Sequence, residues 1–299
     1  MRTRAIRSLA AIVCGCVAIH AIAQDLPQNP DPVPTGGAEA KSDYGLLKRT
    51  PTSKMRDLST DRPDTTESPY TVDAGHFQLE MSLVDYTFDR RNEENVTRRS
   101  VSVAPMLLKL GIMNDFDLQI GIDPYTRERE KNRTTDERTM LSGFGDITVR
   151  TKFNLWGNDS GDTALALMPF VKFPTATGDL GNGKIEGGLI VPLAFELGND
   201  IGAAVMTEFD VVRDGENEWY TIDWVHTATI SVPLVAELSG FVEYAGFANL
   251  NHAEQYRAYF DCGLTYGLKP NTQLDCGLRL GLTRASDDLG MFAGISWRY

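Results

Sequence analysis

Apolar and polar side chains alternate one by one along most of the chain between Gly75 and Tyr299. The clearest run is 116–123, in which Phe, Leu, Ile and Ile alternate with Asp, Gln, Gly and Asp. Successive side chains of a strand point to opposite faces, so this pattern predicts β-strands with one apolar and one polar face. Several runs are nine to fifteen residues long, about the length that a tilted strand needs to cross a bilayer.

Twelve strands are predicted when the weaker runs are counted as well. They are expected near residues 75–88, 97–110, 115–125, 143–155, 162–173, 186–197, 200–212, 219–233, 237–247, 255–268, 272–283 and 289–299. The connections alternate between five short turns and six longer polar loops, the longest of which is predicted at 126–142. This alternation is typical of a transmembrane barrel, whose two rims differ, and it places both termini on the periplasmic rim of short turns.

The last predicted strand favours a membrane barrel over a soluble sandwich, which also alternates but packs its apolar faces between two sheets. Met, Ala, Ile, Trp and Tyr share one face of residues 289–299, and the chain ends on the aromatic Tyr299. Outer-membrane barrels finish on such a strand, so we expect the barrel-assembly machinery to recognise it. The expected fold class is therefore all-β, a single closed antiparallel transmembrane β-barrel of about twelve strands with a disordered N-terminal arm.

Aromatic side chains gather at the ends of the predicted strands. This distribution resembles the two girdles that barrels place at the membrane interfaces, so outer-membrane lipids are an expected partner. An ordinary core position remains the alternative for any one of them. The girdle candidates are Phe116, Trp156, Trp219, Tyr220, Trp297 and Tyr299.

The N-terminus has the pattern of a secretory signal peptide, with a basic start, an apolar stretch from Leu9 to Ile22 and small residues at positions 21 and 23. We expect cleavage after Ala23, Sec-type export and residence in the bacterial outer membrane. Residues 24–56 are rich in Pro, Asp, Gly, Ser and Lys and show no apolar period, which predicts a flexible periplasmic arm. The predicted organisation is a signal peptide at 1–23, this arm at 24–56 and the barrel at 57–299.

The segments Thr60–Tyr70 and Ala74–Glu80 resemble the N-terminal signature of a bacterial family described as the putative MetA pathway of phenol degradation. Weaker resemblances lie at 143–146 and 238–244. The resemblance implies an outer-membrane barrel that passes small, often aromatic or hydrophobic, molecules. Its first segment contains two prolines and several short polar side chains, so it either plugs or lines the periplasmic mouth or is a plain connector. The residues that carry the signature are Asp61, Arg62, Pro63, Asp64, Glu67, Gly75 and Glu80.

The polar set of strand positions lines the lumen if the apolar set faces lipid. Acids outnumber bases in this set, so the charges either pair across the lumen or leave a field that favours cations or neutral solutes. Pairing is the favoured interpretation, because buried charges are less costly in pairs. The candidate lumen-lining residues are Glu80, Asp117, Asp123, Asp146, Arg150, Lys152, Glu208, Asp210, Asp223, Glu243, Asp261, Asp275, Arg279 and Arg298.

Composition narrows the possible functions. The formal charge of −12 argues against a nucleic-acid partner, which needs a basic face. No zinc motif, phosphate-binding glycine loop or nucleophile elbow is recognisable, so we predict no catalytic residue, metal or cofactor, and a protein that is not an enzyme. Cys262 and Cys276 are expected to be small apolar fillers, with a cross-strand disulfide as the less favoured alternative.

The leading functional hypothesis is passive transport of a small, aromatic or hydrophobic solute through the barrel. Twelve strands lie between the eight whose interior is filled by side chains and the sixteen that leave an aqueous channel, so a narrow path is permitted. The alternative is a structural or interaction barrel without an open pore. Such a barrel would bind partners or surface glycans through its extracellular loops, especially the charged stretch 126–142.

Overall fold

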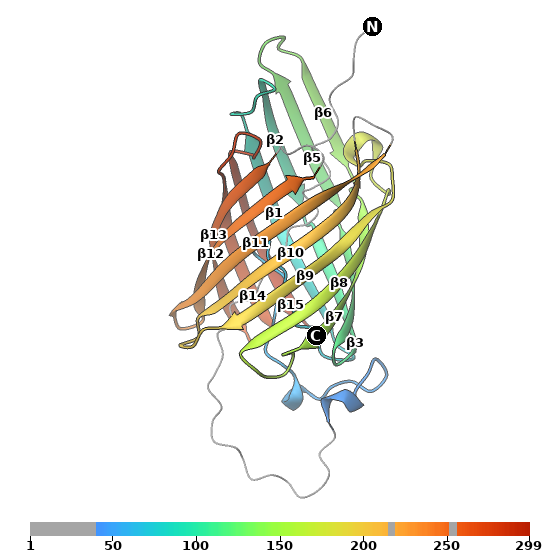
Figure 1. The fold of residues 1–299 in the computed structure, drawn as a ribbon, viewed down its shortest axis with the longest axis vertical. Coiled ribbons are helices and arrows are strands. Elements are labelled where there is room, and N and C mark those ends of the chain that lie inside the picture. Colours follow the sequence, from blue (N-terminus) through green and yellow to red (C-terminus); the bar gives the residue numbers. More distant parts are fainter. Residues whose placement is uncertain (1–39, 215–218, 251–255) are drawn as a thin grey trace, which may run out of the picture.

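One antiparallel sheet that closes on itself makes up the body of the computed structural model, which describes residues 40–214, 219–250 and 256–299. The sheet closes because the last segment, β15, pairs with the first, β1 (Figure 1). Within the described residues, no helix is long and apolar enough to span a membrane. The strand segments are β1 (Phe77–Asp89), β2 (Val96–Val103), β3 (Met106–Met113), β4 (Phe116–Ile122), β5 (Tyr125–Asn132), β6 (Arg138–Gly143), β7 (Ile147–Trp156), β8 (Thr163–Phe173), β9 (Glu186–Glu196), β10 (Gly202–Arg213), β11 (Tyr220–Val235), β12 (Leu238–Asn249), β13 (Arg257–Lys269), β14 (Thr272–Gly281) and β15 (Leu289–Arg298).

The fifteen segments form twelve barrel strands, as the sequence predicts, because three strands are each interrupted once. The breaks separate β2 from β3, β4 from β5 and β6 from β7. Pro105 and Pro124 lie in the first two breaks and carry no backbone N–H for the sheet ladder. The breaks are neighbours in the closed sheet, so one side of the barrel wall is discontinuous at one level.

The prediction of a loop at 126–142 is wrong. Most of this stretch is a hairpin, in which β5 and β6 pair from Arg127 opposite Ser142 to Lys131 opposite Arg138. Only residues 133–137 connect the two segments. The crowded charges suggested a solvated loop, but they alternate in sign, and a two-residue period is compatible with a strand. The hairpin extends the wall beyond the neighbouring strands at the rim of longer loops (Figure 1).

The polar faces of the strands point into the barrel, which confirms the predicted orientation. In β7, Arg150 and Lys152 are buried, whereas Phe153 and Leu155 are exposed. Of the predicted girdle, Trp156, Trp219, Tyr220, Trp297 and Tyr299 are exposed, and Phe116 is half-buried against Phe153. Cys262 and Cys276 carry free thiols.

The chain before β1 passes beneath the rim of short turns and then enters the barrel. The predicted signal peptide lies outside the described residues, as does the arm up to residue 39. From Ala40 the arm forms two short 3-10 helices, η2 (Lys41–Asp43) and η3 (Thr52–Lys54), and buries Tyr44. Residues 58–76, here called the lumen segment, are almost entirely buried within the strands.

Candidate functional site

The lumen segment crosses the interior of the barrel and bonds to strands on several sides of it. Thr60 accepts a hydrogen bond from Gln273 of β14, and Pro69 accepts one from Asn154 of β7. The backbone N–H of Val72 donates to Asp117 of β4 at 3.0 Å. Because these strands lie around the closed sheet, the segment spans the lumen, as the plugging alternative of the sequence analysis anticipates.

A balanced cluster of six buried charges holds the middle of the lumen segment. The carboxylate of Asp61 lies 2.5 Å from Lys109 Nζ and 2.7 Å from Lys152 Nζ. Arg150 lies 3.1 Å from Asp61 and 2.6 Å from Glu67, while Glu80 pairs with Lys109. Three acids thus face three bases, which offsets the large cost of removing these charges from water. Asp61 and Lys152 are fully buried, so the segment fills the lumen at this level.

Arg62 fixes the segment to the side of the barrel where the sheet closes. Its guanidinium bonds to Asp275 of β14 at 2.6 and 3.1 Å and donates to Ser82 of β1. A two-bonded arginine–carboxylate pair is among the strongest polar contacts in proteins. Gly294 of β15 makes room for this guanidinium, because a Cβ built there would lie 2.3 Å from the Arg62 Nη2 atom.

Glu243 of β12 holds the tip of the lumen segment. Its two carboxylate oxygens accept the backbone N–H groups of Thr65 and Thr66, each at 2.7 Å. The Thr66 hydroxyl also lies 2.6 Å from the Thr227 hydroxyl of β11. A single buried acid therefore satisfies two backbone donors that would otherwise lose their water partners.

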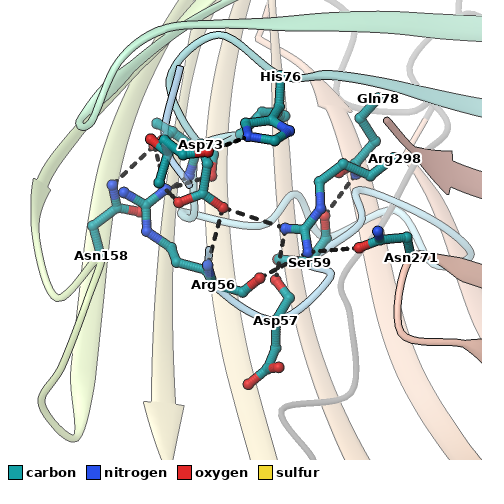
Figure 2. A network of polar contacts seen from close by, with 12 residues as sticks. Arg56, Asp57, Ser59, Asp73, His76, Gln78, Asn158, Asn271 and Arg298 are labelled. Carbon is teal, nitrogen blue, oxygen red and sulfur yellow. Dashed lines mark hydrogen bonds and ion pairs between the residues drawn. The ribbon is translucent and has the colours of Figure 1, made fainter. Parts of the chain in front are cut away.

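A second polar network closes the barrel at the rim of short turns (Figure 2). Arg298 of β15 donates to the backbone oxygens of Arg56 and Asp57, to Asn271 and, at 3.4 Å, to Asp73. Asp73 also accepts the backbone N–H of Arg56 at 3.0 Å. The network fixes the entry of the lumen segment to the last strand of the barrel.

Asp159, in the turn between β7 and β8, ties the N-terminal residues to the same rim. Its carboxylate accepts from Lys41 at 2.7 Å, Asn114 at 2.7 Å and Arg56 at 2.9 Å. Partial burial opposes ionisation of Asp159, but the bonds from Lys41, Asn114 and Arg56 outweigh this effect and lower its pKa to about 2. Asp159 is therefore ionised at any physiological pH.

A cavity lies between the lumen segment and the rim of longer loops, with ≈ 1010 Å³ of space that includes open solvent. Arg62 and Arg150 form part of its floor, and its wall runs along the three strand breaks at Pro105, Asp123 and Gly145. The lining mixes apolar and polar groups. Among these groups are Met106, Leu107, Ile122, Ser100, Ser102 and Asp146.

Acids without a matching number of bases gather on another part of the inner wall. Asp210 of β10 lies opposite Asp223 of β11 in the ladder, and Glu208 is two residues away on β10. Lys172 pairs instead with Glu186 and lies 3.9 Å from Asp146. This part of the lumen therefore carries more acidic than basic side chains.

The fourteen candidate lumen residues lie on the inner side of the barrel, Asp123 and Asp146 in strand breaks and the others in strands, and most belong to these networks. Asp123, Asp210 and Arg279 are half-buried, and the other eleven are buried. Arg279 bonds to Asp261 at 2.8 Å and to Thr65 of the lumen segment. The family-signature residues Asp61, Arg62, Asp64 and Glu67 are buried inside the barrel.

Sequence reasoning missed Lys109 and Gln119, which belong to the same interior. Lys109 alternates with Leu108 and Leu110, so the parity rule would have found it. Gln119 accepts a bond from Arg150 and donates one to Asp117. In the described part of the chain, no group of three or more His, Cys, Asp and Glu side chains is arranged to hold a metal ion.

Comparisons with known proteins agree with this architecture. The sequence profile of the family described as "Putative MetA-pathway of phenol degradation" matches residues 60–299. The COG4313 outer membrane channel from Pseudomonas putida F1 is similar in structure, with a TM-score of 0.57 and 10% identity over 80% of this chain and 99% of that one. At this identity the likeness shows a shared fold. Fainter likenesses include the NanC porin (TM-score 0.45, 9% identity, 74% of this chain and 98% of that one) and the CymD monoaromatic hydrocarbon channel (TM-score 0.43, 10% identity, 75% and 87%). None of the curated proteins that were compared matches the chain.

Proposed function

The chain belongs to the family described as "Putative MetA-pathway of phenol degradation", and from this membership we propose that it is an outer-membrane channel for passive transport of small aromatic or hydrophobic solutes. The cavity above the lumen segment is the observation that carries this proposal. Its mixed lining suits a solute with an apolar ring and a polar substituent, because Met106 and Leu107 cover the ring while Ser100 and Asp123 bond the substituent.

Passage through the inner half of the barrel requires the lumen segment to move. Asp61, Lys109 and Lys152 are almost fully buried at its centre, which leaves no room for a solute beside them. The segment is held by ion pairs and hydrogen bonds rather than by a large apolar core. Polar contacts of this kind exchange readily with water once water enters, so the segment acts as a plug that opens and recloses.

The proposed orientation places both termini and the rim of short turns in the periplasm, as in other barrels of this type. Export follows from the signal peptide at 1–23, which leaves an arm at 24–56 ahead of the barrel. The barrel-assembly machinery would bind the C-terminal strand, because β15 closes the barrel by pairing with β1.

Uptake by vesicles containing the purified protein tests the proposal. We expect phenol and an apolar monoaromatic to enter protein-containing vesicles faster than vesicles without protein, and a sugar of similar volume to enter more slowly. If none of these solutes enters faster through correctly folded protein, the channel proposal fails. The alternative of a closed barrel that binds partners through its loops would then be favoured.

A further inference from the structure

The outer surface of β5 carries an unusual separation of charge. Along Arg127–Lys131 the bases alternate with Glu128 and Glu130, so strand geometry places bases on one face and acids on the other. The acidic face points inward, because Glu130 accepts a bond from Arg98 at 3.1 Å and the neighbouring Thr126 bonds Ser102. The bases therefore point outward, on the same side as the exposed Tyr125.

Neighbouring segments extend this outward face. Arg99 of β2 lies directly opposite Arg129, and Arg138 of β6 lies directly opposite Lys131. Like charges in opposite positions destabilise a sheet unless an anion offsets them. Five bases, here called the outer basic face, thus share one surface of a chain whose formal charge is −12. They are Arg99, Arg127, Arg129, Lys131 and Arg138.

Few acids compensate these bases. Lys131 pairs with Asp136, which also lies 3.9 Å from Arg138. Among the residues that the structure describes, no carboxylate forms an ion pair with Arg99, Arg127 or Arg129. Arg99 stacks over the ring of Phe88 instead. The face is therefore built to meet negative charge from outside the chain.

The position of the outer basic face along the barrel wall indicates which negatively charged groups it meets. Tyr125 and Val103 are exposed and lie opposite each other in the ladder, and beyond Tyr125 the outward positions of β5 are occupied by bases. Arg127 to Lys131 begin two residues beyond Tyr125, at a rise of about 3.4 Å per residue along a tilted strand. The outer basic face thus begins where the apolar outward positions of β5 end, which is the level expected for lipid headgroups.

A shallow hollow on this face provides both charge and apolar contact. It holds ≈ 1570 Å³ of space that includes open solvent, and Arg99, Arg129 and Arg138 line it together with Phe88 and Met140. Guanidinium groups bind phosphate oxygens through paired hydrogen bonds, and the apolar floor suits sugar rings or the start of an acyl chain.

We propose that the outer basic face binds the phosphate groups of the glycolipid in the outer leaflet, lipopolysaccharide. This inference rests on the orientation given above, with the longer loops outside the cell, but not on conduction. Anionic headgroups attract bases near a membrane surface, and each base contributes to the affinity. Bound glycolipid would also relieve the repulsion between Arg99 and Arg129.

The test compares two variants that each lose three positive charges. The first is R99Q/R127Q/R129Q, and its control, K184Q/K269Q/R284Q, changes exposed residues away from the face. Binding of lipopolysaccharide to the purified full-length protein in detergent is measured, alongside the melting temperature and the uptake of phenol. The first variant should bind at least about 10-fold more weakly, and the control should bind like the wild type, with phenol uptake unchanged in both.

Dephosphorylated lipopolysaccharide and inorganic phosphate serve as further probes. The dephosphorylated lipid should bind the wild type about as weakly as native lipopolysaccharide binds the first variant. Millimolar inorganic phosphate should compete poorly with native lipopolysaccharide for the wild type. Equal binding of the native lipid by wild type and first variant, or of both lipids by wild type, would overturn the proposal. If the wild-type protein does not speed phenol uptake, the channel proposal fails, but the measured binding of lipopolysaccharide still tests the present inference.

Discussion

Arg62 and Asp275 form a two-bonded ion pair inside the lumen, between the chain ahead of the first strand and β14, with N–O distances of 2.6 and 3.1 Å. Both side chains are buried, and they are 213 positions apart in the sequence. The pair shows how the lumen segment is held, through charges that the inner wall of the barrel supplies. The segment is therefore held largely by polar contacts with the inner wall.

Removal of Arg62 should destabilise the protein strongly. The Arg62→Ala variant leaves Asp275 as a buried charge without its base, which costs about 3–5 kcal/mol of unfolding free energy. Denaturant unfolding in detergent measures the loss. The exchanged variant R62D/D275R restores the opposite charges, so we expect it to recover part of the stability. If Arg62→Ala unfolds at the same midpoint denaturant concentration as the wild type, the ion pair does not hold the segment.

A methyl group at Gly111 should push the lumen segment out of place. A Cβ built there lies 2.2 Å from the backbone oxygen of Asp73 and 2.5 Å from that of Val72. We expect Gly111→Ala to cost about 1–3 kcal/mol and to raise single-channel conductance. Gly121→Ala is the control, because its Cβ meets only ordinary contacts at 3.5 Å and beyond. Equal conductance in the two variants would argue against close packing of the lumen segment on Gly111.

Reversal of charge at Arg150 and Lys152 should open the barrel. Both bases contact Asp61, so the variant R150E/K152E sets two acids against the acids of the lumen segment. Repulsion in a site with little water is strong, and we expect a several-fold rise in conductance with a preference for cations. Lys184→Glu, in an exposed loop, should leave conductance unchanged in planar bilayers. Unchanged conductance in R150E/K152E would show that these contacts do not hold the plug.

Acid should weaken the rim of short turns through Asp159. Its pKa is about 2 in the folded protein, below the ordinary value of 3.8, so ionised Asp159 stabilises the fold above about pH 4. This contribution is lost as the pH falls from about 4 towards 2. Because the side chain is partly exposed, we expect it to amount to about 1 kcal/mol. Melting temperatures between pH 6 and pH 2 should fall less for Asp159→Asn than for the wild type, and parallel curves would contradict the assignment.

The strands could be predicted from the sequence because their signal is local. The run at 116–123 predicts β4 and its inner and outer faces directly, and the same parity would have identified Lys109. The density of charges at 126–142 favours a loop, whereas the alternation of their signs is the signal that indicates the hairpin of β5 and β6. The predicted strands at 97–110 and 115–125 include Pro105 and Pro124, where the structure has breaks.

The position of the lumen segment inside the barrel could not be predicted from the sequence. Its contacts are distant in the chain, since Asp61 meets Lys152 91 positions later and Thr66 meets Glu243 177 positions later. Short polar side chains and two prolines describe a connector as well as they describe a plug. Only the closed sheet, which sets the inner faces of all the strands around one space, brings these partners together.

A reversible lock on the lumen segment tests the central claim, that solutes pass only when this segment moves. The hydroxyls of Thr66 and Thr227 are 2.6 Å apart, which suits a disulfide in the variant T66C/T227C with Cys262 and Cys276 changed to alanine. Phenol uptake and bilayer conductance are measured on the same sample, first oxidised and then reduced. The account predicts little uptake and conductance in the oxidised form and recovery on reduction. Equal conductance and uptake in the oxidised and reduced forms, with the disulfide verified, would contradict it.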